Sequence, residues 1–107
     1  MRPVAVLGAT GSIGVQALEV IAASPGLEVG ALSAHRDAEG LAVAAGESGA
    51  RFAALSGLEQ PPEIAGVTTF AGEGALEELI AASGADLVLN AIVGAAGLRP
   101  TLAAARA

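Results

Sequence analysis

The sequence predicts an α/β domain in which helices cover both faces of a parallel sheet. Short apolar runs alternate with segments of helical periodicity, which is the pattern of repeated strand–helix–strand units. Of the 107 residues, 53% are hydrophobic and only 2% are aromatic. A core of Val, Ile, Leu and Ala suits helices packed on a buried parallel sheet, and the crossovers are expected to be right-handed.

The chain opens with a predicted strand and helix. Residues 3–7 form an apolar run that ends at Gly8, as expected for a buried strand followed by a turn. From Ser12 onward apolar residues recur at helical spacing, and Pro25-Gly26 marks the end of this helix. The first unit is therefore a strand, a glycine-rich turn and a helix.

A second and a third strand enclose the next helix. Residues 27–33 form the second apolar run and residues 51–55 the third. Between them, Asp37 is placed to cap a helix over residues 38–47, because an Asp side chain accepts hydrogen bonds from the first free N–H groups of a helix. Gly49 follows at the position where a left-handed residue commonly ends a helix.

The next part of the chain begins irregularly and then returns to the same alternation. Residues 56–66 contain two consecutive prolines and are predicted to form a loop with room for one helical turn. A short strand over residues 67–70 precedes a helix that is opened by residues 72–74. Residues 86–93 form the last predicted strand.

The end of the chain predicts a turn over residues 94–97 and a final helix with Pro100 in its first turn. No stop signal follows, so we expect a fragment that ends inside or just after an element. A sheet interrupted there would leave an edge strand unpaired, which favours aggregation.

Composition excludes several functions. Five Lys and Arg residues in a chain of net charge −6 cannot form the basic stripe that a nucleic acid requires, so no nucleic-acid partner is expected. The chain has no cysteine, which excludes a thiolate metal site and a cysteine nucleophile. The longest apolar stretch, residues 87–98, is too short to span a bilayer, and the sequence predicts a cytoplasmic protein without a membrane partner.

Three glycines between the first strand and its helix predict a dinucleotide-binding loop. Gly8 lets the chain turn off the strand, Gly11 lets the backbone approach a pyrophosphate, and Gly14 lets the helix pack on the sheet. Thr10 and Ser12 add hydroxyl donors at the helix N-terminus, which attracts anions. Strand, loop and helix together indicate a Rossmann-type fold, with a purely structural turn as the alternative.

The residues after the second strand favour NADPH over NADH. An acid at the strand end would bind the ribose of NADH, whereas Ser33, His35 and Arg36 can all donate to a 2′-phosphate. The planar guanidinium of Arg36 suits phosphate oxygens, although an ordinary surface role for both basic side chains is the alternative. Asp37 favours NADH, because it lies at about the distance from the loop that is expected for a ribose-binding acid. We expect its carboxylate to cap the following helix instead.

Three segments of the chain are distinctive as sequences. They are residues 6–14, residues 31–37 and, most specifically, residues 90–98 followed by Pro100-Thr101-Leu102. Together they resemble the 1-deoxy-D-xylulose 5-phosphate reductoisomerase family, over nearly the whole chain and least from residue 56 to residue 74. The resemblance implies an NADPH-dependent enzyme of isoprenoid precursor synthesis that converts 1-deoxy-D-xylulose 5-phosphate to 2-C-methyl-D-erythritol 4-phosphate.

The resemblance also implies which residues bind the cofactor. These are Thr10, Gly11, Ser12 and Ile13 in the glycine loop, and His35, Arg36 and Asp37 after the second strand. Residues 91–93 would lie beneath the nicotinamide. The family commonly has Gly where His35 stands and Asn where Asp37 stands.

The resemblance places the chemistry outside this chain. We expect residues 1–107 to be an N-terminal NADPH-binding domain, incomplete at its C-terminal end and inactive by itself, with no catalytic or metal-binding residue. A divalent metal (magnesium or manganese) would chelate the substrate in the absent catalytic domain. The full-length protein is expected to be a homodimer that acts on a small sugar phosphate.

Two other kinds of function stay open. An extended short-chain dehydrogenase or a semialdehyde dehydrogenase begins with a similar loop, but neither accounts for residues 92–98. A non-catalytic nucleotide-sensing module would keep the loop and lose all chemistry. The sequence that follows Ala107 in the gene would distinguish these alternatives.

Overall fold

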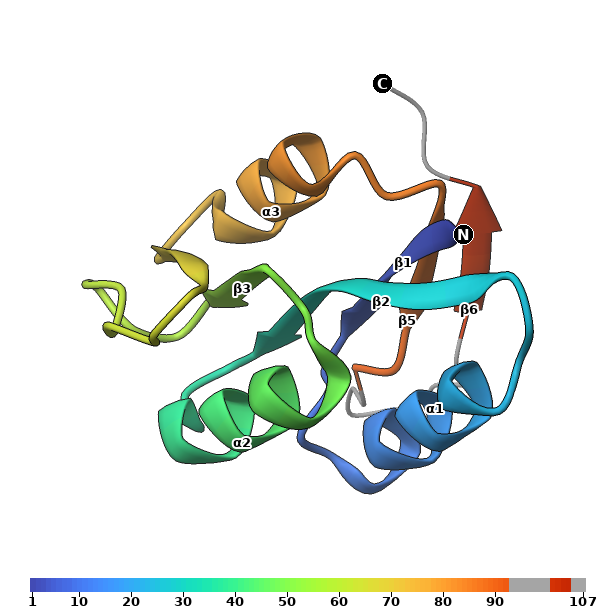
Figure 1. Ribbon diagram of the computed structural model, residues 1–107. Helices are drawn as coiled ribbons and strands as arrows, with labels where there is room; N and C mark the ends of the chain where they lie inside the picture. The colour runs from blue at the N-terminus through green and yellow to red at the C-terminus, as the bar shows by residue number, and fades with distance from the viewer. Residues whose placement is uncertain (93–100, 105–107) are drawn as a thin grey trace.

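The computed structural model describes residues 1–92 and the backbone of residues 101–104. Its elements form a twisted sheet with helices above and below, as Figure 1 shows. Their bounds are β1 Arg2–Leu7, α1 Ser12–Ala22, β2 Leu27–Ala34, α2 Ala38–Ser48, β3 Phe52–Leu55, β4 Thr68–Ala71, α3 Ala75–Ser83, β5 Leu87–Asn90 and β6 Thr101–Ala104.

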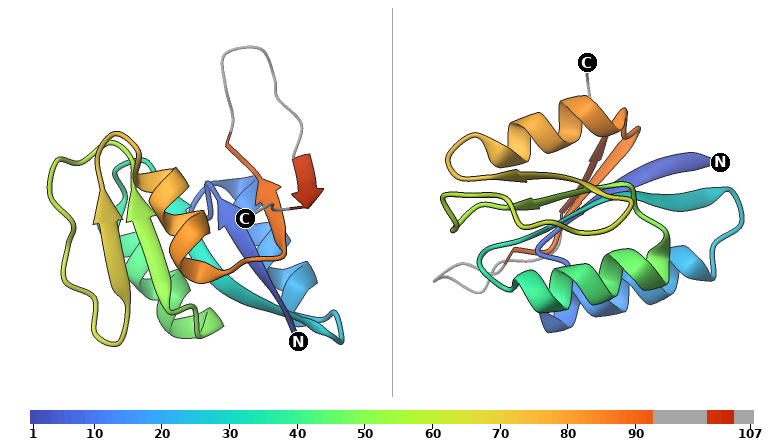
Figure 2. Two further views of the ribbon diagram at one scale, coloured as in Figure 1. Left: turned by 90° about the horizontal axis from the view of Figure 1, so that it is seen from above. Right: turned by 60° about the vertical axis from the view of Figure 1, so that its left-hand side comes forward.

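The strands form one sheet in the order β4-β3-β2-β1-β5-β6. Strands β1 to β5 are parallel, and β6 runs antiparallel to β5. Helices α1 and α2 cover one face of the sheet, and α3 covers the other (Figure 2). The predicted α/β fold with helices on both faces is therefore confirmed, and the strand order reverses at β1 as in a Rossmann-type sheet.

Alternate side chains of the central strands build two separate core layers. Val4 and Val6 pack toward α1 and α2, whereas Ala5 and Leu7 pack toward α3. The register between β1 and β2 shifts at this point and leaves Gly30 as the extra residue of β2. Because the insertion has no side chain, the residues on both sides of it keep their places in the two layers.

The predicted ends of α2 are confirmed. The Oδ1 atom of Asp37 accepts a hydrogen bond of 2.9 Å from the Gly40 N–H, and Gly49 ends the helix with a φ of 78°. Helix α1 begins at Ser12 as predicted and ends at Ala22, shortly before the Pro-Gly pair. Local sequence signals are thus sufficient for these two helices.

The structure differs from the sequence prediction at two places near the end of the chain. β5 ends at Asn90, because the Asn90 side chain accepts a hydrogen bond of 3.0 Å from the Ile92 N–H and turns the chain. Residues Thr101–Ala104 form β6 and not the predicted helix, because pairing with β5 satisfies backbone groups at an edge that was predicted to be open. The predicted turn over residues 94–97, with Val93 before it and Pro100 after it, lies outside the described residues.

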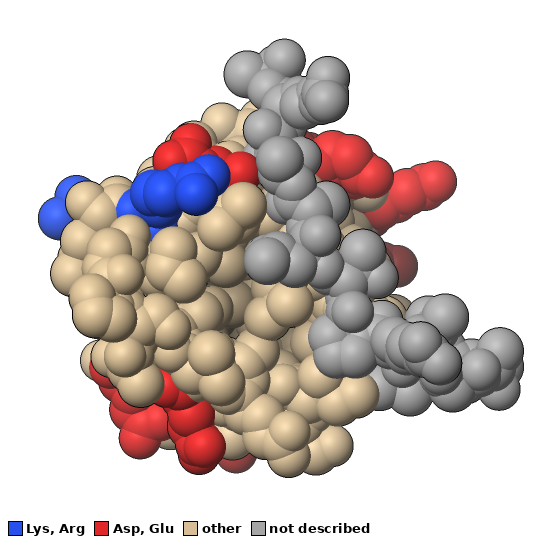
Figure 3. All heavy atoms as spheres, turned by 90° about the vertical axis from the view of Figure 1, so that its right-hand side faces the viewer, with Lys and Arg blue, Asp and Glu red and all other residues tan. Residues whose placement is uncertain are grey.

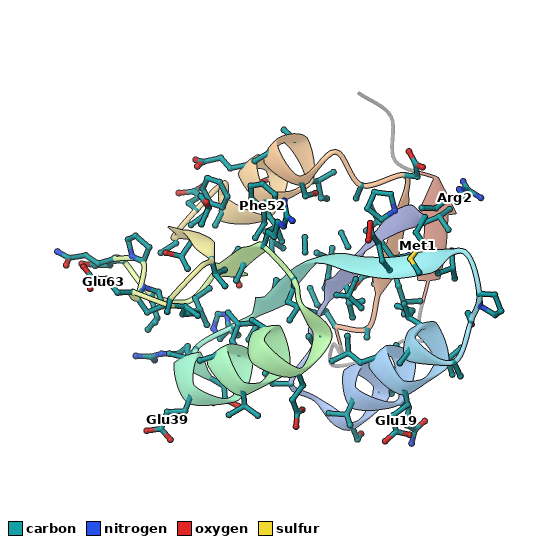
Figure 4. All side chains as sticks on the ribbon, viewed as in Figure 1. Met1, Arg2, Glu19, Glu39, Phe52 and Glu63 are labelled. Carbon is teal, nitrogen blue, oxygen red and sulfur yellow. The ribbon has the colours of Figure 1, made fainter. Side chains whose placement is uncertain are left out.

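The connection from β3 to β4 is a loop, as predicted. It contains an isolated antiparallel bridge between Ile64 and Val67, and no helical turn is formed between residues 56 and 66. At the start of β3, Phe52 packs between the sheet and α3, whereas Glu19 and Glu39 point away from the sheet on the outer sides of α1 and α2 (Figure 4). Within the described part of the chain, no helix is both long and apolar enough to cross a membrane.

Candidate functional site

The carboxyl ends of β1 and β5 lie side by side where the strand order reverses, which is where open parallel sheets bind ligands. The turn after β1 is packed directly against the segment after β5. A Cβ atom added to Gly8 would lie 3.0 Å from the carbonyl carbon of Ala91 and 3.0 Å from the nitrogen of Ile92. Gly8 also has a φ of 79°, so both its conformation and its surroundings require glycine.

Gly14 brings α1 onto this turn. It is buried, and a Cβ atom there would overlap the carbonyl oxygen of Gly8 and lie 2.7 Å from the Cα atom of Ala9. These are backbone atoms that cannot move aside without shifting the helix. The fold itself therefore explains glycine at the first and the third position of the loop, as predicted.

Gly11, the middle glycine, is different. It is the N-cap of α1, with an extended backbone (φ −78°, ψ 169°), and it is exposed. A Cβ atom there would meet only the carbonyl oxygen of Gly8, at 3.8 Å. Neither conformation nor packing requires glycine at this position, and the lack of a side chain leaves the backbone of the N-cap accessible.

The first turn of α1 is free to bind an anion. The helix has no side-chain cap and no acidic residue in its first turn. Its first N–H groups have no partner within the helix and bear a partial positive charge. Thr10 and Ser12 flank the cap and bring two hydroxyl groups to it, and Ile13 is half-buried in the first turn. This arrangement can hold a phosphate group.

Ser33 holds the glycine turn in place from the end of β2. Its Oγ atom accepts a hydrogen bond of 3.1 Å from the Gly8 N–H, and its carbonyl oxygen accepts one of 2.7 Å from the Ala9 N–H. The predicted role of Ser33 as a phosphate donor is wrong, because the residue is only 2% exposed. Loss of its hydroxyl would leave the Gly8 N–H unsatisfied, at a cost of about 1–3 kcal/mol.

The three residues after β2 are exposed at the same edge of the sheet. His35 and Arg36 follow the strand directly, and the Asp37 carboxylate turns back to the N-terminus of α2, as predicted. Arg36 therefore precedes a carboxylate that accepts a hydrogen bond from the Gly40 N–H in the first turn of α2.

Ser56 and Gly57 lie against this segment although their sequence gives no sign of a site. The Oγ atom of Ser56 is 3.3 Å from the Nδ1 atom of His35, and the Gly57 N–H donates to the His35 carbonyl oxygen at 2.7 Å. The one usable signal is their position, directly after the strand that pairs with β2. Parallel strands bring their carboxyl ends to the same edge.

A groove of about 840 Å³ lies between α1 and α2. Its walls are mostly apolar, with Val15, Leu18 and Val43 among them, and it reaches the glycine loop only near Ala9 and Thr10. A dinucleotide phosphate needs N–H groups or cations, and an apolar groove between two helices does not supply them. We therefore place the site at the carboxyl edge of the sheet and not in this groove.

The ionisable side chains of the described residues are too dispersed to form a metal site. No group of three His, Cys, Asp or Glu side chains lies close enough to hold a metal ion in the described part of the chain. Figure 3 shows one face of the molecule, on which uncharged residues fill the centre and acidic side chains lie at the margins. The features that can bind a ligand are thus the backbone amides of α1 and the basic side chains after β2.

Comparison with known proteins connects this arrangement to one family. Residues 4–107 match the family model of 1-deoxy-D-xylulose 5-phosphate reductoisomerase. The chain is 46% identical to the protein of that name from Cupriavidus metallidurans, over 100% of this chain and 30% of the relative. It is also 46% identical to that from Mycobacterium marinum, over 94% of this chain and 25% of the relative.

Solved structures give the same result. The 1-deoxy-D-xylulose 5-phosphate reductoisomerase from Zymomonas mobilis in complex with NADPH matches with a TM-score of 0.74 and 37% identity, over 87% of this chain and 26% of that one. A DOX-P reductoisomerase in complex with NADPH, fosmidomycin and magnesium matches with a TM-score of 0.71 and 29% identity, over 92% of this chain and 26% of that one.

These matches cover nearly the whole chain but only a quarter to a third of each relative. They include the glycine loop, the end of β2 and the segment after β5, whose packing against Gly8 the structure shows. The short-chain and semialdehyde dehydrogenase alternatives find no support in them. The chain belongs to the 1-deoxy-D-xylulose 5-phosphate reductoisomerase family.

Proposed function

We propose that residues 1–107 are the N-terminal NADPH-binding part of a 1-deoxy-D-xylulose 5-phosphate reductoisomerase. The whole protein would isomerise its sugar phosphate substrate and reduce it to 2-C-methyl-D-erythritol 4-phosphate, in isoprenoid precursor synthesis. One structural observation supports the proposal most. It is the exposed Gly11 at a helix N-terminus without a side-chain cap, where the backbone is accessible to a pyrophosphate although the fold itself does not require glycine.

The glycine loop would bind the pyrophosphate. In this proposal the first N–H groups of α1, at Ser12 and Ile13, donate to phosphate oxygens, and the hydroxyls of Thr10 and Ser12 add further donors. Gly11 lets the pyrophosphate lie directly on the backbone. NADPH supplies a hydride when bound, and these residues bind and orient it.

The end of β2 would bind the adenosine 2′-phosphate. Arg36 offers a fork of donors that matches phosphate oxygens, and His35 stands next to it at the same exposed edge. The Asp37 carboxylate accepts from the Gly40 N–H, so it faces the N-terminus of α2, whose partial positive charge offsets part of its repulsion of the phosphate. Ala91 and Ile92, packed against Gly8, would lie under the nicotinamide half, and the third residue of that group, Val93, lies outside the described residues.

The remaining expectations concern the whole protein. By resemblance to the family, the divalent metal, magnesium or manganese, would bind in the catalytic domain of the whole protein. The chain by itself is therefore expected to bind cofactor without catalysing the reaction. A homodimer, a cytoplasmic location and the lack of a nucleic-acid partner stay predictions.

Calorimetric titration with NADPH and with NADH tests the proposal. We expect NADPH to bind at least tenfold more tightly. Arg36→Ala should weaken NADPH binding by about 10- to 100-fold, the worth of a charge-assisted phosphate contact, and leave NADH binding unchanged. Arg51→Ala is the matched control, because Arg51 is exposed and precedes β3, at the amino ends of the parallel strands and away from the proposed site.

The possible results separate two conclusions. Equal binding of the two cofactors, or a preference for NADH, would reject the assignment of the 2′-phosphate to Arg36. Failure to bind either cofactor would reject the proposed function as a whole.

A further inference from the structure

The loop after β3 continues the hydrogen-bonding pattern of the sheet past the strand ends. Leu55, the last residue of β3, pairs with Ala34, the last residue of β2. Beyond this pair, the Ser56 N–H donates to the Ala34 carbonyl oxygen at 3.2 Å, and the Gly57 N–H donates to that of His35 at 2.7 Å. These two hydrogen bonds therefore hold the segments after β2 and β3 side by side where they leave the sheet.

The Ser56 hydroxyl contacts the His35 ring. Its Oγ atom lies 3.3 Å from the Nδ1 atom of His35. When the hydroxyl donates to Nδ1, the ring proton is on Nε2, and that nitrogen becomes a donor. His35 is an exposed residue at the carboxyl ends of the strands, where a ligand can approach its ring.

Gly57 makes room for the side chains of His35 and Arg36. A Cβ atom at Gly57 would lie 2.6 Å from the Cε1 atom and 2.7 Å from the Nε2 atom of His35, and 2.7 Å from the Cγ atom of Arg36. Gly57 is not among the glycines with a positive φ, so its backbone conformation is open to other residues. Glycine is needed there because His35 and Arg36 lie directly over it.

We infer that Ser56 and Gly57 are positioning residues that set the preference for NADPH over NADH. They hold the His35 ring and the stem of Arg36 in an arrangement that presents both donors to the adenosine 2′-phosphate. Neither residue needs to touch the cofactor. The inference rests on the proposed function, because it assumes that the 2′-phosphate binds at His35 and Arg36.

Gly57→Ala and Ser56→Ala test this inference by calorimetry. The atoms that crowd the new Cβ in Gly57→Ala belong to side chains, so the side chains should move while the fold stays intact. We expect NADPH affinity to fall about tenfold in Gly57→Ala and about threefold in Ser56→Ala, the range of one lost or misdirected hydrogen bond. NADH affinity and the melting temperature should not change.

A variant pair shows whether Gly57 acts through its neighbours. In a chain that already carries His35→Ala and Arg36→Ala, the added Gly57→Ala should have no further effect on NADPH affinity. Gly46→Ala is the matched control, because Gly46 is exposed on α2 and a Cβ atom there meets nothing within 4 Å. It should leave both affinities unchanged.

The measured affinities distinguish an error in this inference from an error in the proposed function. If the unmodified chain prefers NADPH but Gly57→Ala and Ser56→Ala keep that preference, the inference is wrong and the proposed function stands. An equal loss of NADPH and NADH binding would show a merely structural role and would also overturn it. If the unmodified chain does not bind NADPH, both the inference and the proposed function are wrong.

Discussion

Helices α1 and α2 begin at the same edge of the sheet, each after a parallel strand, yet their first turns are closed in different ways. α2 is capped by Asp37, whose carboxylate accepts from the Gly40 N–H at 2.9 Å, and it carries Glu39 in its first turn. α1 is capped by Gly11, without a side-chain hydrogen bond and without an acid in its first turn. The chain thus satisfies one helix N-terminus internally and leaves the other open.

The difference indicates where a phosphate can bind. A helix N-terminus attracts anions through free N–H groups and partial positive charge, and an internal carboxylate removes that attraction. α3 also lacks a side-chain cap, but Glu77 and Glu78 stand in its first turn. Among the three described helices, α1 alone is open to an external anion, and it lies at the point where the strand order reverses.

Gly14→Ala is expected to have the largest effect on stability. Its Cβ would overlap the Gly8 carbonyl oxygen, so α1 would move off the turn and the free energy of unfolding should fall by about 3 kcal/mol. Gly46→Ala, the control within α2, should raise stability by up to about 1 kcal/mol through better helix propensity. Urea denaturation measures both. Equal changes in the two variants would mean that α1 does not rest on the glycine turn.

Asp37 substitutions have smaller expected effects and probe the other helix of the comparison. Asp37→Ala should lower the free energy of unfolding by about 1 kcal/mol, the worth of an N-cap, whereas Asp37→Asn should keep the cap. Because Asp37→Asn removes a charge near the proposed 2′-phosphate, NADPH affinity should rise by up to about fivefold, the scale of an exposed charge pair. Thermal melts and calorimetry measure the two effects. An unchanged stability of Asp37→Ala would show that the carboxylate does not cap α2.

Local signals in the sequence were sufficient for most of the fold. The alternation of apolar runs and helical segments gave the five parallel strands and the three described helices, and Asp37 and Gly49 marked the ends of α2. These signals work because each acts within a few residues of the structure that it determines.

Features that depend on distant partners could not be predicted in this way. β6 exists through pairing with β5, although its own residues favoured a helix. Ser33 has the chemistry of a phosphate donor, but its burial against Gly8 appears only when β1 and β2 are paired. The contact between His35 and Ser56 joins two strand ends in the same manner.

Three segments of the sequence were sufficient to identify the family, because they resemble it in residue order and spacing. The family match over residues 4–107 confirms it, whereas the roles of the individual residues in the glycine loop and after β2 stay predictions. Within the glycine loop, Gly11 differs from the other two glycines. Gly8 and Gly14 are needed by the fold, and Gly11 is not.

Calorimetric titration of NADPH into Gly11→Val, beside Gly46→Val, tests the central claim most directly. Both positions leave room for a side chain in the fold, so both variants should remain folded by thermal melting. We predict that Gly11→Val loses at least about 100-fold in NADPH affinity, because the side chain occupies the place of the pyrophosphate, and that Gly46→Val binds normally. Normal NADPH binding by Gly11→Val would contradict the assignment of the cofactor to the open N-terminus of α1.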